Sequence, residues 1–126
     1  MGRVLQAAAG LAVGISMYMA GIPTGHAAGA MALGACAAYG YAFDFPSADA
    51  ARAAAHAKCA GAGCKVVVTL KRNCAAFAID GHRPCGPNGF ASALQLGEAE
   101  NVALQSCYKY GGKDCVIRAF ACDVKG

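Results

Sequence analysis

An internal repeat of about 48 residues constrains the fold of this chain more than any other feature of its sequence. The positions that match at an offset of 48 are Ala51 and Ala99, Ala55 and Ala103, Cys59 and Cys107, and Cys74 and Cys122. Slightly larger offsets, 49 and 51, relate Cys36 to Cys85, Gly40 to Gly89, and Cys64 to Cys115. Self-similarity at such a period indicates two copies of one supersecondary unit.

Each copy has the pattern of two strands, a helix and a further strand. In the first copy "GAMALG" is a short apolar segment and "AAYGYAFDF" alternates as a strand does. "ADAARAAAHAKC" is an alanine-rich helix that Ser47 is placed to cap, and "CKVVVTL" is β-branched. The second copy gives "CAAFAIDG", "GFASAL", "GEAENVALQSCYKY" and "CVIRAFAC" in the same order. We therefore expect an α+β domain of two β-β-α-β repeats, about 30–74 and 75–122, with both helices packed on one antiparallel or mixed sheet.

The aromatic residues Tyr39, Tyr41, Phe43 and Phe45 recur at every second position of the first copy. A strand would place all four rings on one of its faces. Stacked rings on one strand face usually meet a helix, so we expect them to belong to the core.

Residues 1–27 have the composition of a secretory signal. Arg3 supplies a positive charge, residues 4–20 are apolar and uncharged, and small residues precede a cleavage point after Ala27. Cleavage there would leave 99 residues (126 − 27), enough for one small domain. The sequence therefore predicts export, to the periplasm or out of the cell.

Two alternatives at the N-terminus remain open. The apolar run approaches the roughly 17 residues that can barely span a bilayer, so it could stay uncleaved as an anchor. The stretch "LGAC" resembles a bacterial lipobox, in which Cys36 would be lipidated. Membrane association is expected only through one of these two features.

All eight cysteines lie within residues 28–126. An even number in a short exported chain indicates a disulfide framework, which a small domain often needs because its core is modest. A metal site would require C-x-x-C pairs or nearby histidines, whereas the cysteine spacings are irregular and only His56 and His82 follow the signal. We expect neither metal nor cofactor.

The charge of the chain is mildly basic, with 11 Lys and Arg against 7 Asp and Glu. These charges are scattered singly, without a basic stripe or interleaved aromatic residues. Nucleic-acid binding is therefore not expected.

Four stretches carry a family resemblance: "YGYAFDFPSADAARAAAHAKC", "CKVVVTLKRNCAAFAI", "AENVALQSC" and "GGKDCVIRAFAC". In this combination the chain resembles the small exported bacterial proteins grouped as domain of unknown function 4189, over residues 30–122. The resemblance implies export, paired cysteines and a compact two-repeat domain, and it supplies no activity or catalytic residue. Cys36 and Cys85 look like additions to a more usual set of six cysteines.

Eight cysteines allow roughly 105 connectivities, which the sequence alone does not resolve. The repeat adds a constraint, because equivalent positions should pair alike or with each other. We expect two local bridges from helix end to following strand, Cys59–Cys64 and Cys107–Cys115, and two bridges across the repeats, Cys74–Cys122 and Cys36–Cys85. The last bridge argues against lipidation of Cys36, since acylation would leave Cys85 unpaired.

One loop, "IDGHRPCG", is a candidate functional segment because it holds Asp80, His82 and Arg83. His82 and Cys85 could in principle form a nucleophilic pair. The expected pairing of Cys85 and the lack of an oxyanion-hole motif argue against catalysis.

The sequence thus favours a non-enzymatic exported domain that binds an unidentified protein or a component of the cell envelope. A secreted effector or inhibitor acting on another cell is the alternative. A small hydrolase that uses His82 is a third hypothesis.

Overall fold

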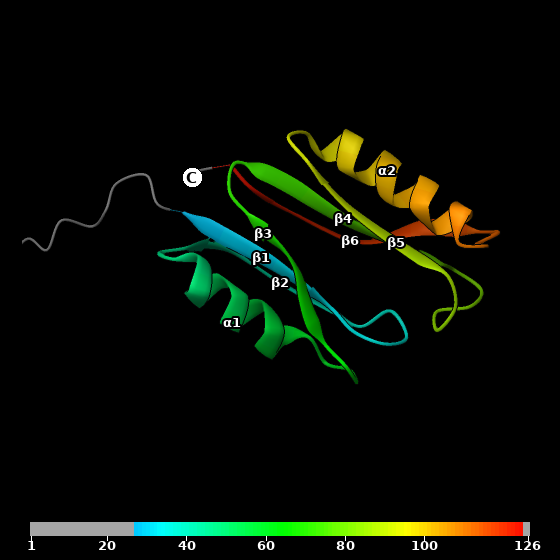
Figure 1. Ribbon diagram of the computed structural model, residues 1–126, viewed down its shortest axis with the longest axis horizontal. Coiled ribbons are helices and arrows are strands. Elements are labelled where there is room, and N and C mark those ends of the chain that lie inside the picture. The colour runs from blue at the N-terminus through cyan, green and yellow to red at the C-terminus, as the bar shows by residue number, and fades with distance from the viewer. Residues whose placement is uncertain (1–26, 125–126) are drawn as a thin grey trace, which may run out of the picture.

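The computed structural model describes residues 27–124, so the predicted signal segment, apart from Ala27, lies outside the described residues. Within this range the order of elements is β-β-α-β followed by β-β-α-β (Figure 1). The elements are β1 (Ala28–Leu33), β2 (Tyr39–Phe45), α1 (Ala48–Lys58), β3 (Lys65–Leu70), β4 (Asn73–Asp80), β5 (Asn88–Ala93), α2 (Leu96–Lys109) and β6 (Cys115–Asp123). The predicted α+β class is confirmed.

The strands form two three-stranded antiparallel sheets, so the expectation of one sheet beneath both helices is wrong. The strand order is β2-β1-β3 in the first sheet and β5-β4-β6 in the second. The chain therefore places the first strand of each half in the centre of its sheet. It passes from one sheet to the other at residues 71–72, where Arg72 has a φ of 55°.

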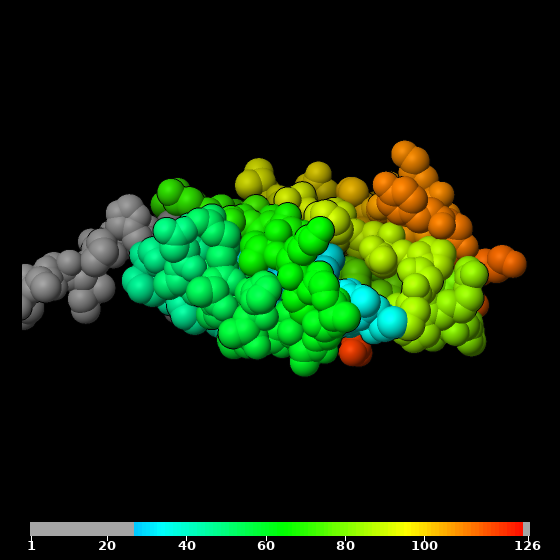
Figure 2. Space-filling model, turned by 60° about the horizontal axis from the view of Figure 1, so that its bottom comes forward, coloured from blue at the N-terminus to red at the C-terminus, as the bar shows by residue number. Residues whose placement is uncertain are grey.

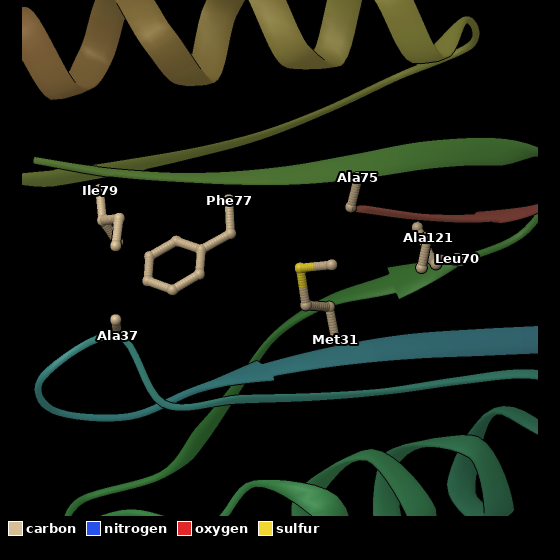
Figure 3. Packing of buried hydrophobic residues seen from close by; sticks show 7 residues of the cluster. All are labelled: Met31, Ala37, Leu70, Ala75, Phe77, Ile79 and Ala121. Atoms are coloured by element: carbon tan, nitrogen blue, oxygen red, sulfur yellow. The ribbon is translucent and has the colours of Figure 1, made fainter. Parts of the chain in front are cut away.

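The two sheets face each other, and each helix covers the outer face of its own sheet (Figure 1). Between the sheets Met31 of β1 points toward Phe77 of β4, with Leu70 and Ile79 in the same cluster (Figure 3). The buried strand residues facing the helices are alanine and cysteine. Both faces of the central strands are thus apolar, and one sheet with both helices on one face would leave the larger side chains in water.

Each helix lies close to its sheet because small residues line the contact. A Cβ on Gly40 of β2 would come within 2.2 Å of the carbonyl oxygen of Ala55 in α1. A Cβ on Gly89 of β5 would come within 2.4 Å of the carbonyl oxygen of Ala103 in α2. The two glycines therefore have the same role in the two halves.

The helix starts differ in their capping. The side chain of Ser47 accepts a hydrogen bond from the N–H of Ala50 at 3.1 Å, which is the cap expected for α1. At the start of α2 the side chain of Gln95 makes no such bond. Asp49 and Glu98 lie in the first turns, where a carboxylate interacts favourably with the helix dipole.

The described chain contains four disulfides: Cys36–Cys85, Cys59–Cys64, Cys74–Cys122 and Cys107–Cys115. These pairs coincide with those expected from the repeat, and no cysteine is free. Cys74–Cys122 nevertheless does not cross between the halves, because β4 already belongs to the second sheet, where Cys74 lies directly opposite Cys122 of β6. Among the four bridges, Cys36–Cys85 alone joins the two halves.

Candidate functional site

The predicted functional loop follows β4 and is organised by the buried carboxylate of Asp80. Its Oδ1 accepts a hydrogen bond from the backbone N–H of His82 at 2.9 Å. Its Oδ2 accepts from the backbone N–H of Lys113 at 3.2 Å and from the guanidinium of Arg83 at 3.4 Å. These donors, the N–H of His82 foremost, hold the pKa of Asp80 below its ordinary value of 3.8. The ionised carboxylate of Asp80 therefore links the loop that follows β4 to the loop that precedes β6.

The imidazole of His82 is directed elsewhere. Its side chain is 80% exposed, and Nε2 lies 3.2 Å from Oδ2 of Asp114, a residue that the sequence analysis did not single out. The sulfur of Cys85 is bonded to Cys36 and so does not supply the thiolate that a Cys–His nucleophile needs. The loop residues lie together as predicted, but His82 meets Asp80 through its backbone and not through its ring.

A second candidate site begins with the rings of Tyr39, Tyr41 and Phe43 on β2. Neighbouring rings in this row are stacked, with centroids 6.3 Å apart. Tyr41 is 36% exposed and Phe43 is 51% exposed. The expectation that the rings belong to the core beneath a helix is therefore wrong for Tyr41 and Phe43, whereas Tyr39 packs at the edge of the core between the sheets.

The reason lies in the other face of β2. Gly40 and Ala42 face α1, and the close approach at Gly40 leaves no room for a ring. The pairing with β1 is interrupted by a bulge near Asp44, whose φ is 59°. The alternation breaks there, so the side chain of Phe45 lies on the helix side of the sheet. It packs against the buried alanines between β1 and α1.

Two hollows, each of about 420 Å³, adjoin the row of rings, and Tyr39 and Tyr41 line both. One hollow follows β2 and reaches Phe43 and Lys58. The other is shared with β6 and α2, through Ile117, Arg118, Ala119, Phe120 and Glu100. We call the surface formed by Tyr39, Tyr41, Phe43, Arg118 and Phe120 the aromatic groove.

The contribution of β6 to the aromatic groove was not expected from the sequence. Arg118 lies at an irregularity in the pairing of β6 with β4, which turns its side chain toward Tyr39 of the other sheet. Phe120 is 53% exposed on the same edge strand. The available signals were a charged residue, Arg118, and a large ring, Phe120, within an otherwise apolar strand. Nothing in the sequence marks the irregularity in strand pairing that directs Arg118 toward Tyr39.

Comparison with known proteins identifies the family. The family described as Domain of unknown function (DUF4189) matches residues 28–122. The chain belongs to the DUF4189 family. The matched range of this DUF4189 domain includes every cysteine, the Asp80 loop and the aromatic groove. Neither the curated proteins nor the solved structures gave a match.

Among residues 27–124, no group of three or more His, Cys, Asp or Glu side chains is arranged to hold a metal ion. No helix in that part of the chain combines the length and the hydrophobicity needed to cross a membrane. Of the two sites described above, the aromatic groove is the one that offers exposed rings beside unpaired strand edges.

Proposed function

We propose that this protein is an exported binding module that captures an extended, acidic segment of a partner protein in the aromatic groove. The observation that carries the proposal is the row of stacked rings on β2, in which half-buried Tyr39 is followed by exposed Tyr41 and Phe43, along an unpaired strand edge. Aromatic residues are enriched at protein interfaces and dominate their binding energy. The four disulfides support export, because such bonds persist in oxidising compartments outside the cytoplasm.

The open edge of β2 supports an extended partner. β2 ends its sheet, so part of its backbone N–H and C=O groups face away from β1. Residues 39–43 contain no lysine or proline, the residues that commonly block pairing at an exposed edge. A partner segment would add to β2 as a further strand, with alternate side chains against the rings. The bulge near Asp44 would end this pairing.

The charges that border the groove favour an acidic segment. Arg118 and Lys58 line the two hollows, and Glu100 is the one acidic residue among the lining side chains. The whole chain carries a formal net charge of +4. Carboxylates on the partner would pair with the two cations, and added salt would weaken the complex by screening.

A selection from displayed random peptides tests the proposal. Oxidised mature protein is the bait, and we expect enriched peptides that alternate apolar and acidic residues. A synthetic copy should bind at least about tenfold more weakly to the double variant Tyr41→Ser, Phe43→Ser. Methylation of alternate backbone nitrogens in the peptide should abolish binding, because those groups pair with β2.

A matched control uses two exposed apolar residues of the other half, one on α2 and one at its C-cap. Val102 and Tyr110 are 44% and 69% exposed, and Val102→Ser with Tyr110→Ser should leave the affinity unchanged. Failure to enrich peptides, or an affinity indifferent to the ring substitutions, would contradict the proposal. If an envelope glycan and no peptide bound through the same rings, the partner would be a carbohydrate and the proposal of a protein partner would be wrong.

A further inference from the structure

The Cys36–Cys85 disulfide differs from the other three in its exposure. Both of its residues are exposed, whereas each of the other bridges contains at least one buried cysteine. Cys36 lies in the β1–β2 loop and Cys85 in the β4–β5 loop. In Figure 2 the cyan β1–β2 loop lies at the surface beside the yellow-green segment that follows β4. A reagent in solution therefore reaches this bridge more readily than the others.

The backbone of the turn that contains Cys36 is strained. Cys36 and Ala37 have φ values of 54° and 66°, in the left-handed region that residues other than glycine rarely adopt. Ala37 is buried in the cluster between the sheets, near Ile79 (Figure 3). The carbonyl oxygen of Ala37 accepts a hydrogen bond from Nε of Arg118 at 3.3 Å. Ala37, the residue that follows Cys36, is therefore hydrogen-bonded to Arg118 of the aromatic groove.

We propose that Cys36–Cys85 is a thiol–disulfide exchange site for a soluble dithiol reductant, and that its opening loosens Arg118 from Tyr39. A thiolate of the reductant attacks one sulfur of the bridge, and the other cysteine leaves as a thiolate. The second thiol of the reductant, as its thiolate, then attacks the mixed disulfide and releases the first cysteine. Two electrons and two protons pass to Cys36 and Cys85, and the reductant becomes a disulfide. The exchange step is independent of the binding function proposed above.

Differential alkylation of the oxidised mature protein tests the exchange site. The protein is treated with graded dithiothreitol without denaturant, quenched with iodoacetamide and mapped by mass spectrometry. We expect Cys36 and Cys85 to be alkylated about tenfold faster than any other cysteine, because attack requires access to sulfur. The variant Cys36→Ser, Cys85→Ser should lack this fast phase. Reduction of another pair first, or of all cysteines together, would overturn the proposal.

The ring resonances of Tyr39 test the link to the groove. Reduction limited to the fast phase should shift the Tyr39 signals in a proton NMR spectrum, because the cation over the ring moves. The ring of Phe45, which lies at the other end of β2 in the cluster beneath α1, is an internal control and should not shift. In Arg118→Ala the Tyr39 signals should respond little to reduction. Unchanged Tyr39 signals in the reduced wild-type protein would refute the link.

Discussion

The guanidinium of Arg118 lies over the ring of Tyr39, with Cζ 5.2 Å from the ring centroid, while its Nε donates to the carbonyl oxygen of Ala37. One side chain of β6 thus contacts both an edge strand of the opposite sheet and the loop before it. Arginine meets both demands because its planar group stacks on a ring and still donates from its edge.

Arg118→Ala should lower the free energy of unfolding by about 1–2 kcal/mol, since it removes a cation–π contact and a hydrogen bond. Arg52 provides the control, because it pairs with Asp49 on the exposed side of α1. Arg52→Ala should cost less than about 0.5 kcal/mol. Urea denaturation of the three proteins measures both effects, and equal losses would show that Arg118 is an ordinary surface residue.

Substitution of either helix-facing glycine should destabilise the domain. In Gly40→Ala and Gly89→Ala the new methyl group would collide with helix backbone, at a cost of about 2–3 kcal/mol each. Gly97, in the first turn of α2, is the matched control because a Cβ there meets nothing within 4 Å. Gly97→Ala should be neutral or stabilising by up to about 1 kcal/mol. Thermal unfolding that ranks Gly97→Ala with the other two would contradict the packing described for the helices.

The stabilisation of the folded protein by the Asp80 carboxylate should be lost in acid. Its pKa is lowered in the folded protein, so the unfolded chain binds a proton more readily as the pH drops. The stabilisation by the carboxylate is complete above the ordinary pKa of 3.8 and is lost as the pH falls below it through the folded pKa. The difference in melting temperature between wild type and Asp80→Asn should therefore narrow as the pH is lowered from 5 to about 2. A constant difference would contradict this role.

His82→Ala is the control for that series. His82 donates to Asp80 from its backbone, so the variant keeps the bond and should show the acid profile and melting temperature of the wild type. The same variant tests the third functional hypothesis. A hydrolytic activity that disappears in His82→Ala at an unchanged melting temperature would establish a catalytic role for this residue.

Thiol titration of denatured, unreduced protein should find no free thiol, because every cysteine of the described chain is bonded. Peptide mapping without reduction should recover the four pairs of the structure. Two or more reactive thiols per chain would refute the framework. A peptide that joins Cys59 to Cys74, or Cys36 to Cys64, would show a different connectivity.

The elements and local bridges were predictable because they depend on short-range signals. Ser47 caps α1 as its position suggests, and the spacing from Cys59 to Cys64 suits a helix end and the next strand. Cys74 shows the limit of such reasoning. Its pairing with Cys122 follows from the repeat offset, yet the two residues lie on neighbouring strands of one sheet and not in equivalent strands.

The aromatic groove was not predictable from alternation alone. Alternation places Tyr41 and Phe43 on one face but does not say which face meets the helix. That choice depends on the close contact at Gly40 and on the bulge at Asp44, which are set by tertiary packing. The division into two sheets likewise depends on Phe77 finding the inner face of the other sheet, a contact between distant parts of the chain.

Both ends of the described chain lie at the same end of the molecule. A Cβ on Gly29, in β1, would lie 3.4 Å from the Cβ of Asp123, the last residue of β6. The Cys36–Cys85 loops lie at the opposite end (Figure 1). A short linker should therefore join the termini in a circular permutant. Flanking domains, or a surface tether at either terminus, would attach at that end and leave the Cys36–Cys85 loops at the far end of the molecule.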